Sequence, residues 1–158
     1  MVFSRGSGLA TIARMERQEG VASLGLACAP DGIPAVLDRV EGFLEEIQVS
    51  RATTLQLRLV VEEILVNAAT HGRLPNAADA AVLALGADSS EVRIEIRDRG
   101  LAFDPVGEPE IPERRETAGG VGLKLVRALV DELSYARRDG WNILTLTKKL
   151  PRSGTEGV

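Results

Sequence analysis

The order in which periodic segments follow one another limits the fold of this chain more than any other feature. A short apolar segment comes first, followed by two helical segments, two alternating segments, one more helical segment and two final alternating segments. These segments span residues 22–29, 34–49, 54–72, 80–87, 91–98, 119–133, 133–138 and 141–149. Strands that come in hairpins and helices that come in succession predict the α+β class. We expect a two-layer α/β sandwich with a mostly antiparallel sheet and helices on one face, and not a doubly wound parallel sheet.

The length of 158 residues corresponds to one domain. We assign residues 1–20 to an N-terminal extension, with one short helix over 9–18, residues 21–150 to the domain and residues 151–158 to a tail. The stretch 99–118 is irregular and rich in proline, glycine and charge. Irregular stretches of this length are typical of functional lids or of disordered segments.

Charge and composition exclude several classes of function. The chain has 19 Lys and Arg against 23 Asp and Glu, a formal charge of −4, whereas nucleic-acid binders need a basic surface. A single cysteine, Cys28, and a single histidine, His71, exclude an intramolecular disulfide and any site that needs two imidazoles. No apolar stretch is long enough to span a membrane and no targeting signal is recognisable. We therefore expect a cytoplasmic protein with no nucleic-acid and no membrane partner.

The second predicted helix carries polar residues in its apolar stripe. Leu59, Val60 and Val66 define part of that stripe, and Glu63 and Asn67 lie one turn apart within it. A carboxylate and an amide on an inward face need partners. Two functions fit them: oxygen ligands for a hydrated Mg²⁺, and a general base at the glutamate.

A purely structural interpretation of this pair stays open, because a buried hydrogen-bonded pair or a surface position would place the same residues there. Glu62 serves as a comparison. It has Arg58 four residues before it, a spacing typical of an ion pair on the solvated flank of a helix.

Two further motifs follow strands or open a helix. Asp98 and Gly100 stand at the end of an alternating strand. A turn alone would explain both residues. A carboxylate at this place could also accept a hydrogen bond from an exocyclic amine such as that of adenine. Gly119, Gly120 and Gly122 open the third predicted helix, and free N–H groups at a helix start favour an anion. The glycines match neither a Walker A loop nor a dinucleotide fingerprint.

Together the three motifs resemble the ATP-binding boxes of the GHKL superfamily, and most closely its anti-sigma-factor serine kinases. The E-x-x-x-N box is matched by Glu63 and Asn67, the D-x-G-x-x-F-D-P box by Asp98, Gly100, Phe103, Asp104 and Pro105, and the G-x-G-L box by Gly120, Gly122 and Leu123. The resemblance covers about residues 21–150. It implies the Bergerat-type ATP-binding fold, with residues 106–118 as the ATP lid.

The resemblance also implies roles for individual residues. Glu63 would be catalytic and polarise the attacking hydroxyl or water, Asn67 would ligate Mg²⁺, and Asp98 would receive the adenine amino group. Asn142 lies near the place where relatives often carry a threonine that helps to hold the adenine. The full set of implied ATP-binding positions is Asn67, Asp98, Gly100, Ala102, Phe103, Arg114, Arg115, Gly119, Gly120, Val121, Gly122, Leu123 and Asn142.

Two positions depart from the family pattern. Ala102 stands where many members have a second glycine. Ala118 and Gly119 stand where some kinases of the group have an arginine, which leaves Arg114 or Arg115 as candidates for contacting the γ-phosphate. If neither contacts it, ATP binding would persist while phosphoryl transfer would be slow.

The resemblance implies a serine/threonine-protein kinase of a partner-switching system that uses ATP and Mg²⁺. It would phosphorylate a STAS-type anti-anti-sigma protein, hold a sigma factor or similar target, and form a homodimer. Leu24 and Leu26, on a possible edge strand, give the dimer its only support from the residues. The alternative functions are an ATP-gated binding module without kinase activity and, less favoured, an ATPase that hydrolyses ATP on its own.

Overall fold

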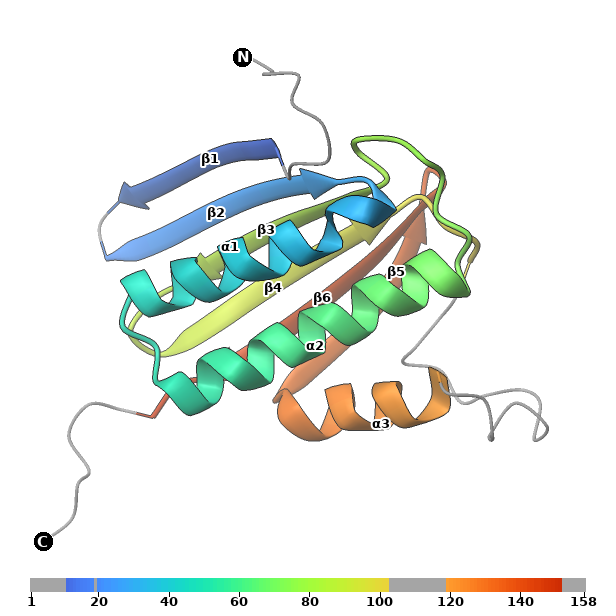
Figure 1. Ribbon diagram of the computed structural model, residues 1–158. Helices are drawn as coiled ribbons and strands as arrows, with labels where there is room; N and C mark the ends of the chain where they lie inside the picture. The colour runs from blue at the N-terminus through green and yellow to red at the C-terminus, as the bar shows by residue number, and fades with distance from the viewer. Residues whose placement is uncertain (1–10, 19, 103–118, 152–158) are drawn as a thin grey trace, which may run out of the picture.

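In the part of the chain that the structure describes, six antiparallel strands form one sheet, and the helices α1, α2 and α3 lie on one side of it (Figure 1). The computed structural model describes residues 11–18, 20–102 and 119–151. The elements are β1 (Thr11–Gln18), β2 (Val21–Cys28), the short 3₁₀ helix η1 (Pro30–Gly32), α1 (Ile33–Glu46), α2 (Arg51–Thr70), β3 (Ala81–Ala87), β4 (Glu91–Asp98), α3 (Gly119–Leu129), β5 (Glu132–Arg138) and β6 (Trp141–Lys149). The strand order is β1-β2-β3-β4-β6-β5. This confirms the predicted α+β sandwich with helices on one face.

The first strand is an element that the sequence did not predict. Residues 9–18 were expected to contain a helix, but Thr11–Gln18 forms β1 and pairs antiparallel with β2. The helix prediction was wrong because an unpaired strand edge offers a row of N–H and C=O groups to any neighbouring segment. The hydrophobic periodicity of residues 9–18 cannot predict this pairing, because the pairing depends on another strand.

The proposed edge position of β2 was also wrong. β2 lies between β1 and β3, and its Leu24 and Leu26 are 2% and 0% exposed. Both side chains belong to the core and offer no apolar surface to a second copy of the chain. The homodimer therefore stays a prediction that rests on the resemblance alone.

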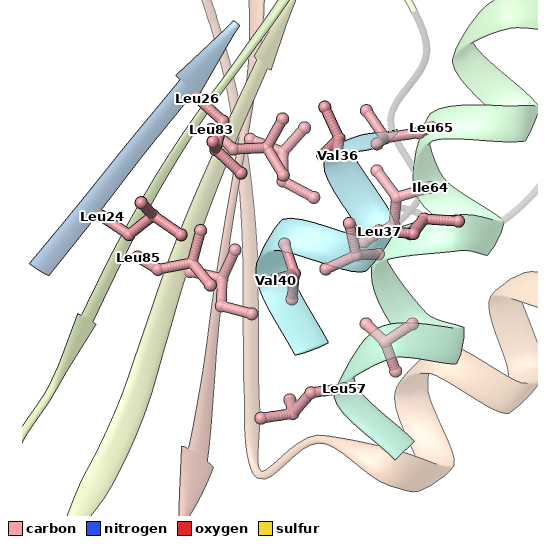
Figure 2. Close-up of a cluster of buried hydrophobic side chains, with 14 of the residues drawn as sticks. Leu24, Leu26, Val36, Leu37, Val40, Leu57, Ile64, Leu65, Leu83 and Leu85 are labelled. Carbon is pink, nitrogen blue, oxygen red and sulfur yellow. The ribbon is translucent and has the colours of Figure 1, made fainter. Parts of the chain in front are cut away.

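The core lies between the sheet and the first two helices. Inward-facing residues alternate along β2 and β3, so that every second side chain is buried. Each fully buried leucine stabilises the fold by roughly 1.5–3 kcal/mol relative to an exposed one. Figure 2 shows the packed side chains of Leu24, Leu26, Val36, Leu37, Val40, Leu57, Ile64, Leu65, Leu83 and Leu85.

The N-terminal half of α2 is held by a cap and by an ion pair to α1. The Ser50 hydroxyl accepts a hydrogen bond from the Thr53 N–H at 3.3 Å, which satisfies one donor of the first turn. Arg58 pairs with Glu41 of α1 at 2.8 Å and with Glu62 at 3.6 Å. This confirms the predicted place of Glu62 on the solvated flank of the helix.

Cys28 at the end of β2 is a buried thiol, 3% exposed. Burial, with a smaller contribution from the charge of Asp31, raises the pKa of the Cys28 thiol from 9.0 to about 11. Because the folded-state pKa lies above the unfolded value, the contribution to stability is complete below pH 9 and is lost as the pH rises through about 11.

We therefore expect Cys28 to resist thiol reagents in the folded protein, since the thiolate is the reactive form. At pH 8, a disulfide reagent such as dithionitrobenzoate should label no thiol in minutes, and should label one thiol per chain after denaturation. Rapid stoichiometric labelling of the folded protein would contradict this environment.

Candidate functional site

A hollow opens between the C-terminal half of α2, the adjacent ends of β4 and β6, and the helix α3. Its empty volume is about 430 Å³, which includes open solvent at its mouth. Its walls are mostly apolar, with a few polar groups that converge on the space. The lining residues are Ile64, Asn67, Ala68, Gly72, Asp98, Leu101, Leu123, Tyr135, Asn142 and Leu144.

The helix α2 contributes Glu63 and Asn67, both of which are half-buried. The predicted apolar stripe was partly wrong, because Val60 is buried whereas Leu59 and Val66 are 37% and 41% exposed. Contacts with α1, the sheet and α3 rotate the buried face away from these two residues. That face consists of Thr53, Thr54, Leu57, Val60, Val61, Ile64 and Leu65. Glu63 and Asn67 therefore lie at its border and not within it.

Asn67 has an unsatisfied polar group at the wall of the hollow. Its Nδ2 atom is buried and has no hydrogen-bond partner among the described residues. A buried amide without a partner is costly, and such groups usually have a ligand, ion or water. His71, one turn further along, is exposed and only ends the helix, where its N–H donates to the Asn67 carbonyl at 2.9 Å.

Asp98, the last residue of β4, supplies the buried carboxylate of the hollow and is 9% exposed. Its Oδ1 accepts hydrogen bonds from the Gly100 N–H at 2.8 Å and from the Asn142 amide at 2.9 Å. Both hydrogen bonds that this carboxylate accepts within the described part of the chain use Oδ1. Its second oxygen, Oδ2, is therefore the acceptor available to a ligand.

Gly100 has no room for a side chain. A Cβ atom there would lie 2.8 Å from Asp98 Oδ1 and 2.8 Å from the Gly72 carbonyl oxygen. The neighbouring Leu101 N–H donates to the same Gly72 carbonyl at 2.7 Å, which ties the turn after β4 to the end of α2. The close approach at Gly100 is thus made by the protein's own backbone, and it brings Asp98 and Asn67 to the same hollow.

Asn142 of β6 is paired directly with Asp98 in the sheet register. It is 5% exposed, and its Nδ2 also donates to the Leu101 carbonyl at 2.9 Å. Its Oδ1 accepts from the Tyr135 hydroxyl at 2.7 Å and from Arg137 Nη1 at 2.8 Å. Sequence reasoning missed Tyr135 and Arg137, because nothing in the alternation of a hairpin strand distinguishes them.

The first turn of α3 meets Glu63. The helix begins at Gly119, and a Cβ atom added at Gly122 would lie 3.0 Å from Glu63 Cδ and still closer to its Oε2. Gly122 therefore permits the carboxylate of α2 and the N-terminus of α3 to come together. Leu123, the next residue, lines the hollow.

The contact predicts a specific effect of the substitution Gly122→Ala. The added methyl group meets the flexible end of Glu63, so we expect the fold to persist and the carboxylate to move. Thermal unfolding should shift by only a few degrees, because alanine is favoured over glycine within a helix. Any activity that depends on Glu63 should fall at least about tenfold, as expected for a misplaced reacting group. Unchanged activity would show that the position of Glu63 is not critical.

The structure brings most of the predicted site residues together. Asn67, Asp98, Leu123 and Asn142 line the hollow, Gly100 backs Asp98, and Gly122 contacts Glu63. Gly119, Gly120 and Val121 contribute helical backbone at the start of α3, and Ala102 is exposed beside the hollow. Phe103, Arg114, Arg115 and the predicted lid 106–118 lie outside the described residues, as do Asp104 and Pro105.

The layered sheet, the carboxylate at the end of β4 and the glycine-opened helix define an α+β fold of the GHKL type. The chain belongs to the family of histidine kinase-like ATPase domains, whose sequence model matches residues 26–148. The expected family is therefore confirmed.

Two curated relatives carry kinase names. The serine/threonine-protein kinase BtrW of Bordetella bronchiseptica is 38% identical over 113 residues, which cover 66% of this chain and 80% of BtrW. The serine-protein kinase RsbW of Oceanobacillus iheyensis is 27% identical over 113 residues, covering 66% of this chain and 72% of RsbW. The expected enzyme class, a protein serine/threonine kinase, is the class of both relatives.

A solved structure supports the fold. The crystal structure of the RsbU and RsbW domains of Rv1364c from Mycobacterium tuberculosis matches with a TM-score of 0.63 at 21% identity, over 82% of this chain. This chain corresponds to 33% of that polypeptide. Separately, none of the helices in the described part of the chain is long and apolar enough to cross a membrane.

Proposed function

We propose that this chain is an ATP-dependent serine-protein kinase and anti-sigma factor of a partner-switching system. It would phosphorylate a serine of a STAS-type anti-anti-sigma protein and would hold a sigma factor or similar target. The observation that carries the proposal is one hollow in which the buried Asp98 carboxylate and the unpartnered Asn67 amide converge, with Glu63 and the start of α3 beside it. The 38% sequence identity of this chain to a serine/threonine-protein kinase over 113 residues supports the same proposal.

Each residue has a role in this proposal. Asp98 Oδ2 accepts from the adenine amino group, and the backbone N–H groups of Gly119, Gly120 and Gly122 bind phosphate oxygens at the positive end of α3. Glu63 orients and polarises the serine hydroxyl that attacks the γ-phosphate. The chemistry is phosphoryl transfer, which depends on positioning and on neutralisation of charge.

Asn67 would hold a magnesium ion through its amide oxygen, because amide oxygens are suitable ligands for this cation, whereas the buried atom that lacks a partner is the nitrogen Nδ2. The oxygen and nitrogen of the amide exchange places by a rotation of the side chain. No cluster of three His, Cys, Asp or Glu side chains occurs among the described residues. Asn67 would hold the ion together with phosphate oxygens of the nucleotide. When bound, Mg²⁺ would neutralise phosphate charge.

The substitution Asn67→Ala should therefore remove the dependence of ATP binding on Mg²⁺. Calorimetric titrations with ATP at increasing Mg²⁺ should show rising affinity for the unmodified protein and a flat response for the variant. A variant whose affinity still rises with Mg²⁺ would contradict the role of Asn67.

The kinase activity is tested by incubating the protein with γ-labelled ATP and its folded cognate anti-anti-sigma protein. Labelled phosphoserine on that protein is the expected result. ATP binding without phosphoserine would instead support the alternative, an ATP-gated binding module, which the absence of the usual arginine at Ala118 and Gly119 favours. Proteins that co-purify only in the presence of ATP would identify the target. The cytoplasmic location and the homodimer belong to the same proposal, and light scattering after gel filtration tests the dimer.

A further inference from the structure

The amide of Asn142 is held in one orientation by two donors. The Tyr135 hydroxyl, at 2.7 Å, and the Arg137 guanidinium, at 2.8 Å, both point to its Oδ1. A flipped amide would place its NH₂ group against these donors. The oxygen therefore faces β5, and the NH₂ group faces Asp98 and the turn after β4.

The fixed NH₂ group in turn occupies one oxygen of Asp98. It donates to Asp98 Oδ1 at 2.9 Å, beside the Gly100 N–H at 2.8 Å, so that two donors converge on the same oxygen. Both donors hold this oxygen as an acceptor and stop the carboxylate from rotating. Asp98 Oδ2 is thereby kept as a fixed acceptor, the group that recognises a donor on a ligand.

Two of these side chains, Asn142 and Arg137, also hold the turn that follows Asp98. Asn142 Nδ2 donates to the Leu101 carbonyl at 2.9 Å, and Arg137 Nη1 donates to the Gly100 carbonyl at 3.0 Å. Since Gly100 and Leu101 also contact Gly72 at the end of α2, the network connects β5, β6 and the turn to the helix that carries Asn67.

We propose that Asn142, oriented by Tyr135 and Arg137, is a positioning residue that makes the hollow selective for a purine with an exocyclic amino group. Its two amide hydrogens are used by Asp98 and Leu101, so it acts through Asp98 and does not itself contact the base. This inference rests on the proposed ATP-binding function, and it replaces the direct adenine contact expected for Asn142 with an indirect role.

The test compares two nucleotides on the full chain. One is ATP, and the other is purine riboside triphosphate, which lacks only the amino group. The unmodified protein should prefer ATP by about tenfold or more, because hydrogen bonds to charged groups are strong. In Asn142→Asp, which keeps the shape but places a carboxylate against Asp98, this preference should fall to near unity while the affinity for the second nucleotide stays within about twofold. Asn142→Ala should behave in the same way.

Tyr135→Phe removes one of the two donors to Asn142 Oδ1. The preference for ATP over purine riboside triphosphate should then fall only partially, to about a third of the value for the unmodified protein, because Arg137 still holds the amide. Thr145→Ala is the matched control: it lies on the same strand, but its side chain alternates to the opposite face of the sheet from Asn142. It should keep the full preference. Circular dichroism and thermal unfolding establish that each variant folds.

The outcomes separate the inference from the function on which it rests. If the unmodified protein does not distinguish the two nucleotides, the adenine role of Asp98 fails and the inference fails with it. If the unmodified protein prefers ATP and both folded Asn142 variants keep that preference, only the positioning role is overturned. A parallel loss of affinity for both nucleotides would show that Asn142 merely maintains the shape of the hollow, and would also overturn it.

Discussion

Replacement of Asp98 by asparagine is expected to lower the affinity for ATP by about 10- to 150-fold, equivalent to ~1.5–3 kcal/mol for a hydrogen bond to a charged group. The Gly100 N–H and the Asn142 amide both donate to Oδ1 and would keep an oxygen at that position. The new NH₂ group would then take the place of Oδ2 and face the amino group of adenine. Two donors would meet where a donor now meets an acceptor.

Isothermal titration calorimetry with ATP and Mg²⁺ measures this loss. Asp88→Asn is the matched control, because Asp88 is an exposed residue of the β3–β4 turn where asparagine is equally suited. That variant should bind ATP normally. An Asp98→Asn protein that folds and binds ATP with unchanged affinity would refute the role of this carboxylate.

Replacement of Glu63 by glutamine is expected to have the largest effect on turnover. The affinity for ATP should stay within about threefold, because the proposed contacts with the base and the phosphates come from other residues. Phosphoryl transfer to the antagonist should fall by about 10²- to 10⁴-fold, the usual contribution of a general base. The amide keeps the size of the side chain beside Gly122, so the packing at the start of α3 is preserved.

Glu62→Gln provides the comparison for this experiment. Glu62 is the adjacent residue, pairs with Arg58 and has a side chain that is 42% exposed. Initial rates of phosphoserine formation should be unchanged in Glu62→Gln and nearly abolished in Glu63→Gln. Normal turnover of the Glu63 variant would remove this residue from the mechanism, and equal losses in both variants would indicate a general effect on α2.

The fold class was predictable because its determinants are local. The alternation of Val92, Ile94 and Ile96 predicted β4, and Asp139-Gly140 predicted the hairpin between β5 and β6, where both residues have positive φ values of 51° and 80°. The motifs that carry Glu63, Asn67, Asp98 and Gly122 were recognisable for the same reason, since each occupies a few consecutive turns or a strand end. The spacing of residue types along the chain therefore predicts local structure.

Long-range contacts decided the rest. The strand β1 exists because an open edge of β2 accepts it, and the exposure of Leu59 and Val66 follows from the way α2 packs against α1, α3 and the sheet. The periodicity of a single segment predicts neither the pairing of β1 nor the exposure of these two side chains.

The sequence by itself determined the elements from β2 onward, their order and the residue types available for chemistry, because hydrophobic spacing and turn residues act within a few positions of one another. The tertiary structure alone decided that Asn142, 44 residues after Asp98, holds that carboxylate in place. It also decided that Gly122 touches Glu63 and that Gly100 meets Gly72. Such pairings depend on strand register and on the packing of α3 against α2, which emerge only when the layers come together.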